Sequence, residues 1–178
     1  VAREDNFIST KIWASQYLTE GTVEKSLELL GTDYIDLMFI HQPAGDFMAG
    51  YRKLETVAIR PMVNQIEFHP GQMQEETVSY CKDHNIIVEA WSPLGTGRML
   101  SNEMLKSIAA KYGKSAAQLC IRWCLQNGIL PLPKSVTPSR IIENADVFDF
   151  EITNEDMEAI NGMEYCGGSG LHPDKVDF

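Results

Sequence analysis

Cations and hydroxyl groups cluster in one short stretch toward the C-terminal end of the chain. Residues 134–144 read KSVTPSRIIEN, in which Lys134 and Arg140 supply two positive charges, and Ser135 and Thr137 supply two hydroxyl groups. A proline follows Thr137, and proline suits the first position of a helix. The free N–H groups and positive potential of a helix N-terminus attract anions. The stretch therefore predicts a phosphate site, better suited to a phosphate monoester than to a ribose diol.

Two more candidate side chains lie near the ends of strand-like runs. Lys11 belongs to residues 7–13 (FISTKIW), and His41 to residues 34–43 (YIDLMFIHQP). The second run is apolar on both faces, which is typical of a buried parallel strand. Barrels and doubly wound sheets place their chemistry at the C-terminal ends of such strands. Taken alone, however, this run favours a core histidine that caps a strand.

The remaining elements indicate an α/β fold. Three further runs have strand character, at residues 62–70, 86–93 and 129–135, and helical stretches separate several of the strands. Ser115 with Gln118 has the spacing of a capping box at a helix start. This alternation predicts functional groups at the C-terminal strand ends. Five helices are expected at residues 21–30, 75–84, 101–112, 115–126 and 153–163. Two more are expected to begin at residues 50 and 137.

Five segments, taken in order, resemble the aldo-keto reductase family. They are FISTKIW, YIDLMFIHQP, MVNQIEFHP, VEAWSPLG and LPKSVTPSRIIENADVFDFEIT, and they extend over nearly the whole chain. The bacterial 2,5-diketo-D-gluconate reductase type is the most similar branch. The resemblance implies a (β/α)8 barrel, with residues 1–178 forming a single but partial barrel domain.

The length of the chain conflicts with a complete barrel. Five strands cannot close an eight-stranded barrel, which typically needs roughly 250 residues. Compared with the family, the N-terminal strands precede Val1, and a strand with a Ser-Asn pair is missing near Thr56 and Val57. We therefore expect a chain numbered through gaps, with a truncated gene product as the alternative.

The resemblance implies a catalytic set of Tyr, Lys, Asp and His. Lys11 matches the lysine that lowers the tyrosine pKa, since a nearby ammonium stabilises a phenolate. His41 matches the histidine that orients the substrate carbonyl. The Tyr and Asp motifs do not occur among these residues. Trp13 and Gln42 would line the substrate pocket, and Gln42 stands where Trp is common, which suggests small dicarbonyl or keto-sugar substrates.

The same resemblance assigns NADPH as the cofactor. The stretch at residues 134–144 would hold its 2′-phosphate, with Glu143 and Asn144 near the adenine. Gln65 would hold the nicotinamide carboxamide, and Trp91 would stack on the nicotinamide. Neither a GxGxxG fingerprint nor a P-loop occurs. The implied cofactor residues are Asn64, Gln65, Trp91, Ser92, Leu94, Gly95, Lys134, Ser135, Val136, Thr137, Arg140, Glu143 and Asn144.

Composition narrows the classes of partner. A net charge of −10 argues against a nucleic-acid surface. The sequence has no run of about 18 apolar residues, so no membrane span is predicted. Cys120 and Cys124 are four residues apart on an apolar helix, so core packing is favoured over a metal or disulfide. We expect a cytoplasmic monomer that acts on small carbonyl compounds and holds no metal.

Two other functions stay open. His41, Glu67, His69 and Glu89 lie at or near strand ends and could form a hydrolase metal site. That hypothesis leaves residues 134–144 unexplained. The second alternative is a non-catalytic NADPH-binding or interaction protein on the same fold, because a fold does not fix a function.

Overall fold

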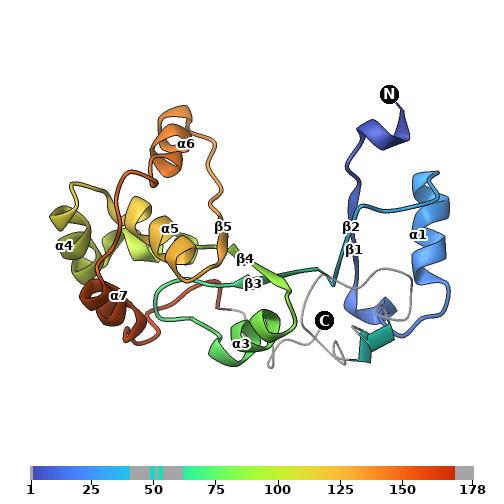
Figure 1. The fold of residues 1–178 in the computed structure, drawn as a ribbon, viewed down its shortest axis with the longest axis horizontal. Helices are drawn as coiled ribbons and strands as arrows, with labels where there is room; N and C mark the ends of the chain where they lie inside the picture. The colour runs from blue at the N-terminus through green and yellow to red at the C-terminus, as the bar shows by residue number, and fades with distance from the viewer. Residues whose placement is uncertain (1, 41–48, 51, 54–61, 171–178) are drawn as a thin grey trace. The chain divides into compact units, whose positions relative to one another are not determined.

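The computed structural model describes residues 2–40, 49–50, 52–53 and 62–170, which Figure 1 shows as a ribbon. The chain divides into two compact units, residues 1–64 with 171–178, and residues 65–170. All five expected strands are present, at positions within the predicted runs. They form two sheets in the described part of the chain, one of two strands and one of three.

The first unit is built on two parallel strands, β1 (Ser9–Ile12) and β2 (Leu37–Ile40), joined through helix α1 (Thr22–Leu30). Asp36 fixes the start of both strands, because its carboxylate accepts hydrogen bonds from the backbone of Ile8 (2.8 Å) and from Arg3 (2.7 Å). The Ile8 hydrogen bond, followed by that from Arg3, holds the pKa of Asp36 below its ordinary value of 3.8. Short 3-10 turns at Arg3–Asp5 and Ala14–Gln16 complete the unit.

The second unit places helices around the sheet β3–β4–β5, with β4 and β5 parallel. A short 3-10 segment, Gly95–Ser101, precedes the fourth helix. The strands are β3 (Val63–Glu67), β4 (Ile87–Trp91) and β5 (Leu130–Leu132), and the helices are α3 (Glu75–Asp83), α4 (Glu103–Lys111), α5 (Ala116–Gln126), α6 (Pro138–Ala145) and α7 (Asn154–Asn161).

The core of this unit centres on α5. Trp123 is fully buried and stacks on Phe68 with ring centroids 4.8 Å apart, while its indole N–H donates to the Asn161 side chain at 2.7 Å. Cys120 and Cys124 are buried on the same helix, as predicted, and burial raises the pKa of Cys120 to about 12. A thiol with so high a pKa stays protonated and packs as an apolar side chain.

Local sequence signals account for most of the helix starts. The capping box of Ser115 and Gln118 is complete at α5, and the hydroxyl group of Thr153 accepts from the backbone of Asp156 at α7. Helix α6 begins at Pro138, as expected, although Thr137 makes no side-chain cap. No helix in the described residues is long and apolar enough to cross a membrane.

Candidate cofactor-binding site

A cavity of about 700 Å³ opens where the loop after β4 meets the loop after β5 and helix α6. Its volume lies in the range of small-molecule and cofactor sites. The cavity brings together two segments that are about 40 residues apart in the sequence and that the family resemblance assigned to one cofactor. The predicted residues that line it are Ser92, Leu94, Lys134, Ser135, Arg140, Glu143 and Asn144.

The loop after β4 has an unusual backbone where it borders the cavity. Ser92 (φ 49°), Gly95 (φ 54°) and Thr96 (φ 54°) all adopt left-handed conformations. A Cβ atom added at Gly95 would lie 2.8 Å from the Met99 methyl group, and the positive φ of this residue also favours glycine. Non-glycine residues in this region cost of order 1–3 kcal/mol each and concentrate at ligand sites. The loop geometry thus supports a binding role for this edge of the sheet.

Three cations face the cavity, and two of them have no internal counter-charge. Neither the Lys134 nor the Arg140 side chain forms an ion pair or hydrogen bond with a described residue, whereas Lys106 pairs with Glu103 at 2.9 Å. The remaining wall combines hydroxyl groups with apolar side chains such as Leu94 and Leu100. Exposed cations and hydroxyl groups suit phosphate oxygens, while apolar walls suit a flat base. This donor set fits a phosphorylated nucleotide such as NADPH.

Glu143 is held in place by the start of α5. The hydroxyl group of Ser115 donates to Oε1 of Glu143 at 2.6 Å, so this carboxylate is oriented before any ligand arrives. Ser115 lines the cavity itself, together with the first two residues of α5. Sequence reasoning identified Ser115 only as a helix cap, because nothing in the local pattern indicates a partner 28 residues away.

Sequence reasoning missed several residues of the cavity wall. Continuity was the available hint for five of them, because Pro93, Leu132 and Pro133 stand inside the quoted motifs and Thr96 and Gly97 directly follow the SPLG loop. The others reach the cavity through the packing of the segment before α4 and of helices α4 and α5, and no local signal distinguishes them. The missed residues are Pro93, Thr96, Gly97, Leu100, Lys106, Ser115, Ala116, Ala117, Leu132 and Pro133.

Other predicted cofactor residues lie outside the lining of this cavity. Gln65 on β3 donates to the Glu89 carboxylate on β4 at 3.0 Å, so these two strands present their polar groups to each other. Trp91 is half-buried at the end of β4, and Val136 is 78% exposed. Asn64, Gly95 and Thr137 are also absent from the lining.

The predicted catalytic residues belong to the first unit or lie outside the described residues. Lys11 is an exposed residue of β1 in register with Phe39, and its side chain forms no ion pair or hydrogen bond with a described residue. Trp13 follows the same strand and is 39% exposed. His41 and Gln42 come directly after β2 and fall outside the described residues.

Glu67 and His69 belong to no group of metal-binding side chains among the described residues. Both are buried at the end of β3. Glu67 accepts hydrogen bonds from the backbone and hydroxyl group of Ser169, at 2.7 and 2.6 Å. Among the described residues, no group of three or more His, Cys, Asp or Glu side chains could hold a metal ion. The hydrolase hypothesis therefore gains no support from the described residues, while its remaining member, His41, is not among them.

Comparisons with known proteins identify the family to which the chain is similar. The model of the aldo/keto reductase family matches residues 48–164. The chain is 42% identical to the glyoxal reductase of Bacillus subtilis and 36% identical to the methylglyoxal reductase DkgA of Yersinia pestis, covering all of this chain and 75% of each relative. A silkworm aldo-keto reductase solved with NADPH matches with a TM-score of 0.72 and 30% identity, covering 92% of this chain and 65% of that one.

The alignment with glyoxal reductase is also informative about length. It spans 208 positions against 178 residues here, a difference of 30, so that relative has segments within the matched span that this chain lacks. The division of the strands into two sheets between β2 and β3 agrees with a missing segment. An α/β chain of this kind supplies five strands of the family's (β/α)8 barrel, and this chain belongs to the aldo/keto reductase family.

Proposed function

We propose that this chain reduces small dicarbonyl compounds or keto-sugars to alcohols and that its cavity at residues 92–144 holds NADPH. As an aldo-keto reductase, it is an NADP-dependent oxidoreductase that acts on aldehydes and ketones. The observation that carries the proposal is the meeting of two distant motifs at one cavity. Two cations there, Lys134 and Arg140, form no ion pair with a described residue.

Within this proposal, residues of the cavity wall and other predicted residues outside it bind different parts of the cofactor. Lys134, Arg140 and the hydroxyl groups of Ser135 and Thr137 bind the 2′-phosphate, and Glu143 with Asn144 contacts the adenine. Gln65 and Asn64 hold the nicotinamide carboxamide, beside the aromatic face of Trp91. Bound NADPH supplies the hydride, and the chain's own groups bind, orient and exclude water from the reacting centre.

The proposed catalytic residues are Lys11 and His41. The ammonium of Lys11 lowers the pKa of a proton-donating tyrosine, and His41 orients the carbonyl oxygen. None of the six tyrosines of this sequence stands in the family's motif, so none of them is assigned as the proton donor. The names of the relatives, glyoxal and methylglyoxal reductase, together with Gln42 in the proposed pocket, support small polar carbonyl substrates.

We also propose a single partial barrel domain that works as a cytoplasmic monomer. Support for a reducing compartment comes from four cysteines that form no disulfide, Cys81, Cys120, Cys124 and Cys166.

The cofactor assignment is tested by Arg140→Ala. A charge-assisted hydrogen bond contributes about 1.5–3 kcal/mol, so the Kd for NADPH should rise by roughly one to two decades, while that for NADH changes little. Lys82→Ala is the matched control, because Lys82 is an exposed cation on α3 that does not line this cavity. An equal loss for both cofactors would show that Arg140 does not read the phosphate.

Activity separates the reductase from a non-catalytic NADPH-binding protein on the same fold. NADPH oxidation is followed by the absorbance of the reduced nicotinamide, with methylglyoxal, phenylglyoxal and 2,5-diketogluconate in turn. Reduction of any of them supports the proposal. A protein that binds NADPH but oxidises it with none of these carbonyls would favour the non-catalytic alternative.

A further inference from the structure

Helix α6 carries three cavity residues, Arg140, Glu143 and Asn144, but it buries no side chain. Its two isoleucines are exposed, Ile141 at 53% and Ile142 at 73%. Most helices in globular proteins are held by an apolar face packed on the core. Within the described residues, α6 has no such face, so something other than apolar burial must set its position beside the cavity.

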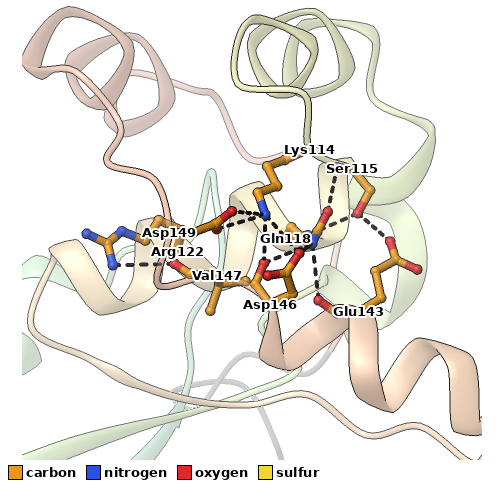
Figure 2. A network of polar contacts seen from close by, with 8 residues as sticks. All are labelled: Lys114, Ser115, Gln118, Arg122, Glu143, Asp146, Val147 and Asp149. Carbon is orange, nitrogen blue, oxygen red and sulfur yellow. Dashed lines mark hydrogen bonds and ion pairs between the residues drawn. The ribbon is translucent and has the colours of Figure 1, made fainter.

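Polar contacts from the start of α5 hold α6 beside the cavity. Figure 2 shows the side chain of Gln118, a residue of α5, beside Glu143 and Asp146. Its side-chain NH2 group donates to the backbone carbonyl groups of Glu143 at 3.2 Å and Asp146 at 2.9 Å. Ser115 donates to the Glu143 carboxylate, and the Lys114 ammonium contacts the Asp146 carboxylate at 2.9 Å. We call these five residues, Lys114, Ser115, Gln118, Glu143 and Asp146, the α5–α6 clamp.

Gln118 is the centre of the clamp, because both ends of its amide are used. Its Oε1 accepts from the backbone N–H of Ser115 at 3.0 Å, which closes the capping box of α5. Its NH2 group is the half that reaches α6. The residue is only 7% exposed, so water cannot easily replace these hydrogen bonds. Losing buried partners of this kind costs more than losing exposed ones.

We propose that Gln118, supported by Ser115, is a positioning residue for cofactor binding: it fixes α6 so that Arg140, Glu143 and Asn144 face the cavity. The inference rests on the proposed NADPH site. It adds a residue that does not itself line the cavity, and it explains how a helix without buried side chains can hold the adenosine 2′-phosphate end of the cofactor.

The substitution Gln118→Glu separates the two uses of this side chain. Glutamate is the other standard residue at this capping-box position, so the acceptor for the Ser115 N–H is kept. The two donors to α6 are lost, and a negative charge faces the carbonyl groups of Glu143 and Asp146. Gln126→Glu is the matched control on the same helix. Gln126 contacts the backbone of Ile152 at both amide ends and does not line the cavity.

Binding is measured with NADPH and with adenosine 2′,5′-bisphosphate, which carries the phosphate but no nicotinamide. Gln118→Glu should raise both Kd values about tenfold, the effect of roughly 1.4 kcal/mol. Gln126→Glu should leave both within about twofold. Gln118→Met, which removes the donors without adding a charge, should weaken binding in the same direction and covers the case in which the glutamate variant does not fold.

Hydrogen exchange without ligand tests the clamp independently of the cofactor. Amides at residues 138–145 should exchange faster in Gln118→Glu, with those of α4 unchanged. If the unmodified protein binds neither ligand, the NADPH site is wrong, and faster exchange in α6 alone would still support the clamp. Unchanged exchange in α6, unchanged Kd values, or an equal loss of affinity in Gln126→Glu would each overturn the positioning role.

Discussion

The hydroxyl group of Tyr112 donates a hydrogen bond of 2.6 Å to the carboxylate of Asp156. The same oxygen accepts from the backbone N–H of Thr153 at 3.0 Å. One phenol at the end of α4 therefore satisfies two groups at the start of α7, a helix whose first N–H groups have no partner within the helix itself. Lys111 pairs with the same carboxylate, on which α4 and α7 converge.

We expect Tyr112→Phe to destabilise the protein by about 1–3 kcal/mol, because a buried carboxylate and a backbone N–H lose a partner. Urea denaturation followed by circular dichroism measures the change. Tyr80→Phe is the control, since the Tyr80 hydroxyl group makes no hydrogen bond with a described residue and the side chain is 39% exposed. Equal destabilisation by the two substitutions would show that the Tyr112 hydroxyl group has no special role.

The pH dependence of stability should carry the signature of Asp156. The hydrogen bonds from Lys111, first, and then from Tyr112 lower the pKa of Asp156 below its ordinary value of 3.8. A carboxyl group with a lowered folded-state pKa stabilises the fold above its unfolded pKa, and this contribution is lost as the pH falls through the folded value. Stability should therefore decline below about pH 3.8.

Asp156→Asn isolates that contribution. The variant should be less stable than the unmodified protein at pH 7, and the difference should shrink as the pH drops below 3.8. Asp149→Asn is the comparison, because Asp149 is also paired with a lysine but is 59% exposed, and exposed pairs contribute little. A constant difference between Asp156→Asn and the unmodified protein at every pH would contradict the assignment.

Gly168 should not tolerate a larger side chain. A Cβ atom there would lie 2.6 Å from both Glu67 Oε1 and His69 Nε2, two buried atoms that cannot move aside easily. Gly168→Ala should cost roughly 1–3 kcal/mol and expose residues 164–170 to protease. Gly162→Ala is the control, because the nearest atom to its Cβ would be 3.4 Å away. Thermal melting and limited proteolysis of the two variants give the answer.

Lys11→Met should separate binding from chemistry. If Lys11 tunes the proton donor, turnover should fall by about 10²-fold or more while the Kd for NADPH stays nearly constant. Lys25→Met serves as control, because Lys25 is an exposed lysine of α1 that pairs only with Glu28 among the described residues. Full activity of the Lys11 variant would remove Lys11 from the catalytic set.

Local signals predicted much of this fold because they need only neighbouring residues. The capping box of Ser115 and Gln118, the proline that starts α6 and the five strand runs all belong to this kind. The family motifs also predicted seven residues of the cavity wall. Sequence alone could not supply the partners of these residues at long range.

Gln118 and Glu67 illustrate the long-range contacts that the sequence could not predict. Gln118 was correctly predicted as a cap, yet its NH2 group bonds residues 25 and 28 positions away. Glu67 was considered as a metal ligand, whereas its carboxylate binds Ser169, 102 positions away. In both cases, the residue type predicts a polar contact, and only tertiary packing decides which group fulfils it.

The absence of buried side chains in α6 has a thermodynamic consequence. Burial of apolar surface produces a heat-capacity change, and apolar stabilisation weakens on cooling for that reason. When a helix that is attached through amide, hydroxyl and ammonium groups detaches, it exposes little apolar surface to water. The attachment of α6 should therefore change little in the cold, when apolar contacts in the core around Trp123 weaken, and respond instead to ionic strength through Lys114.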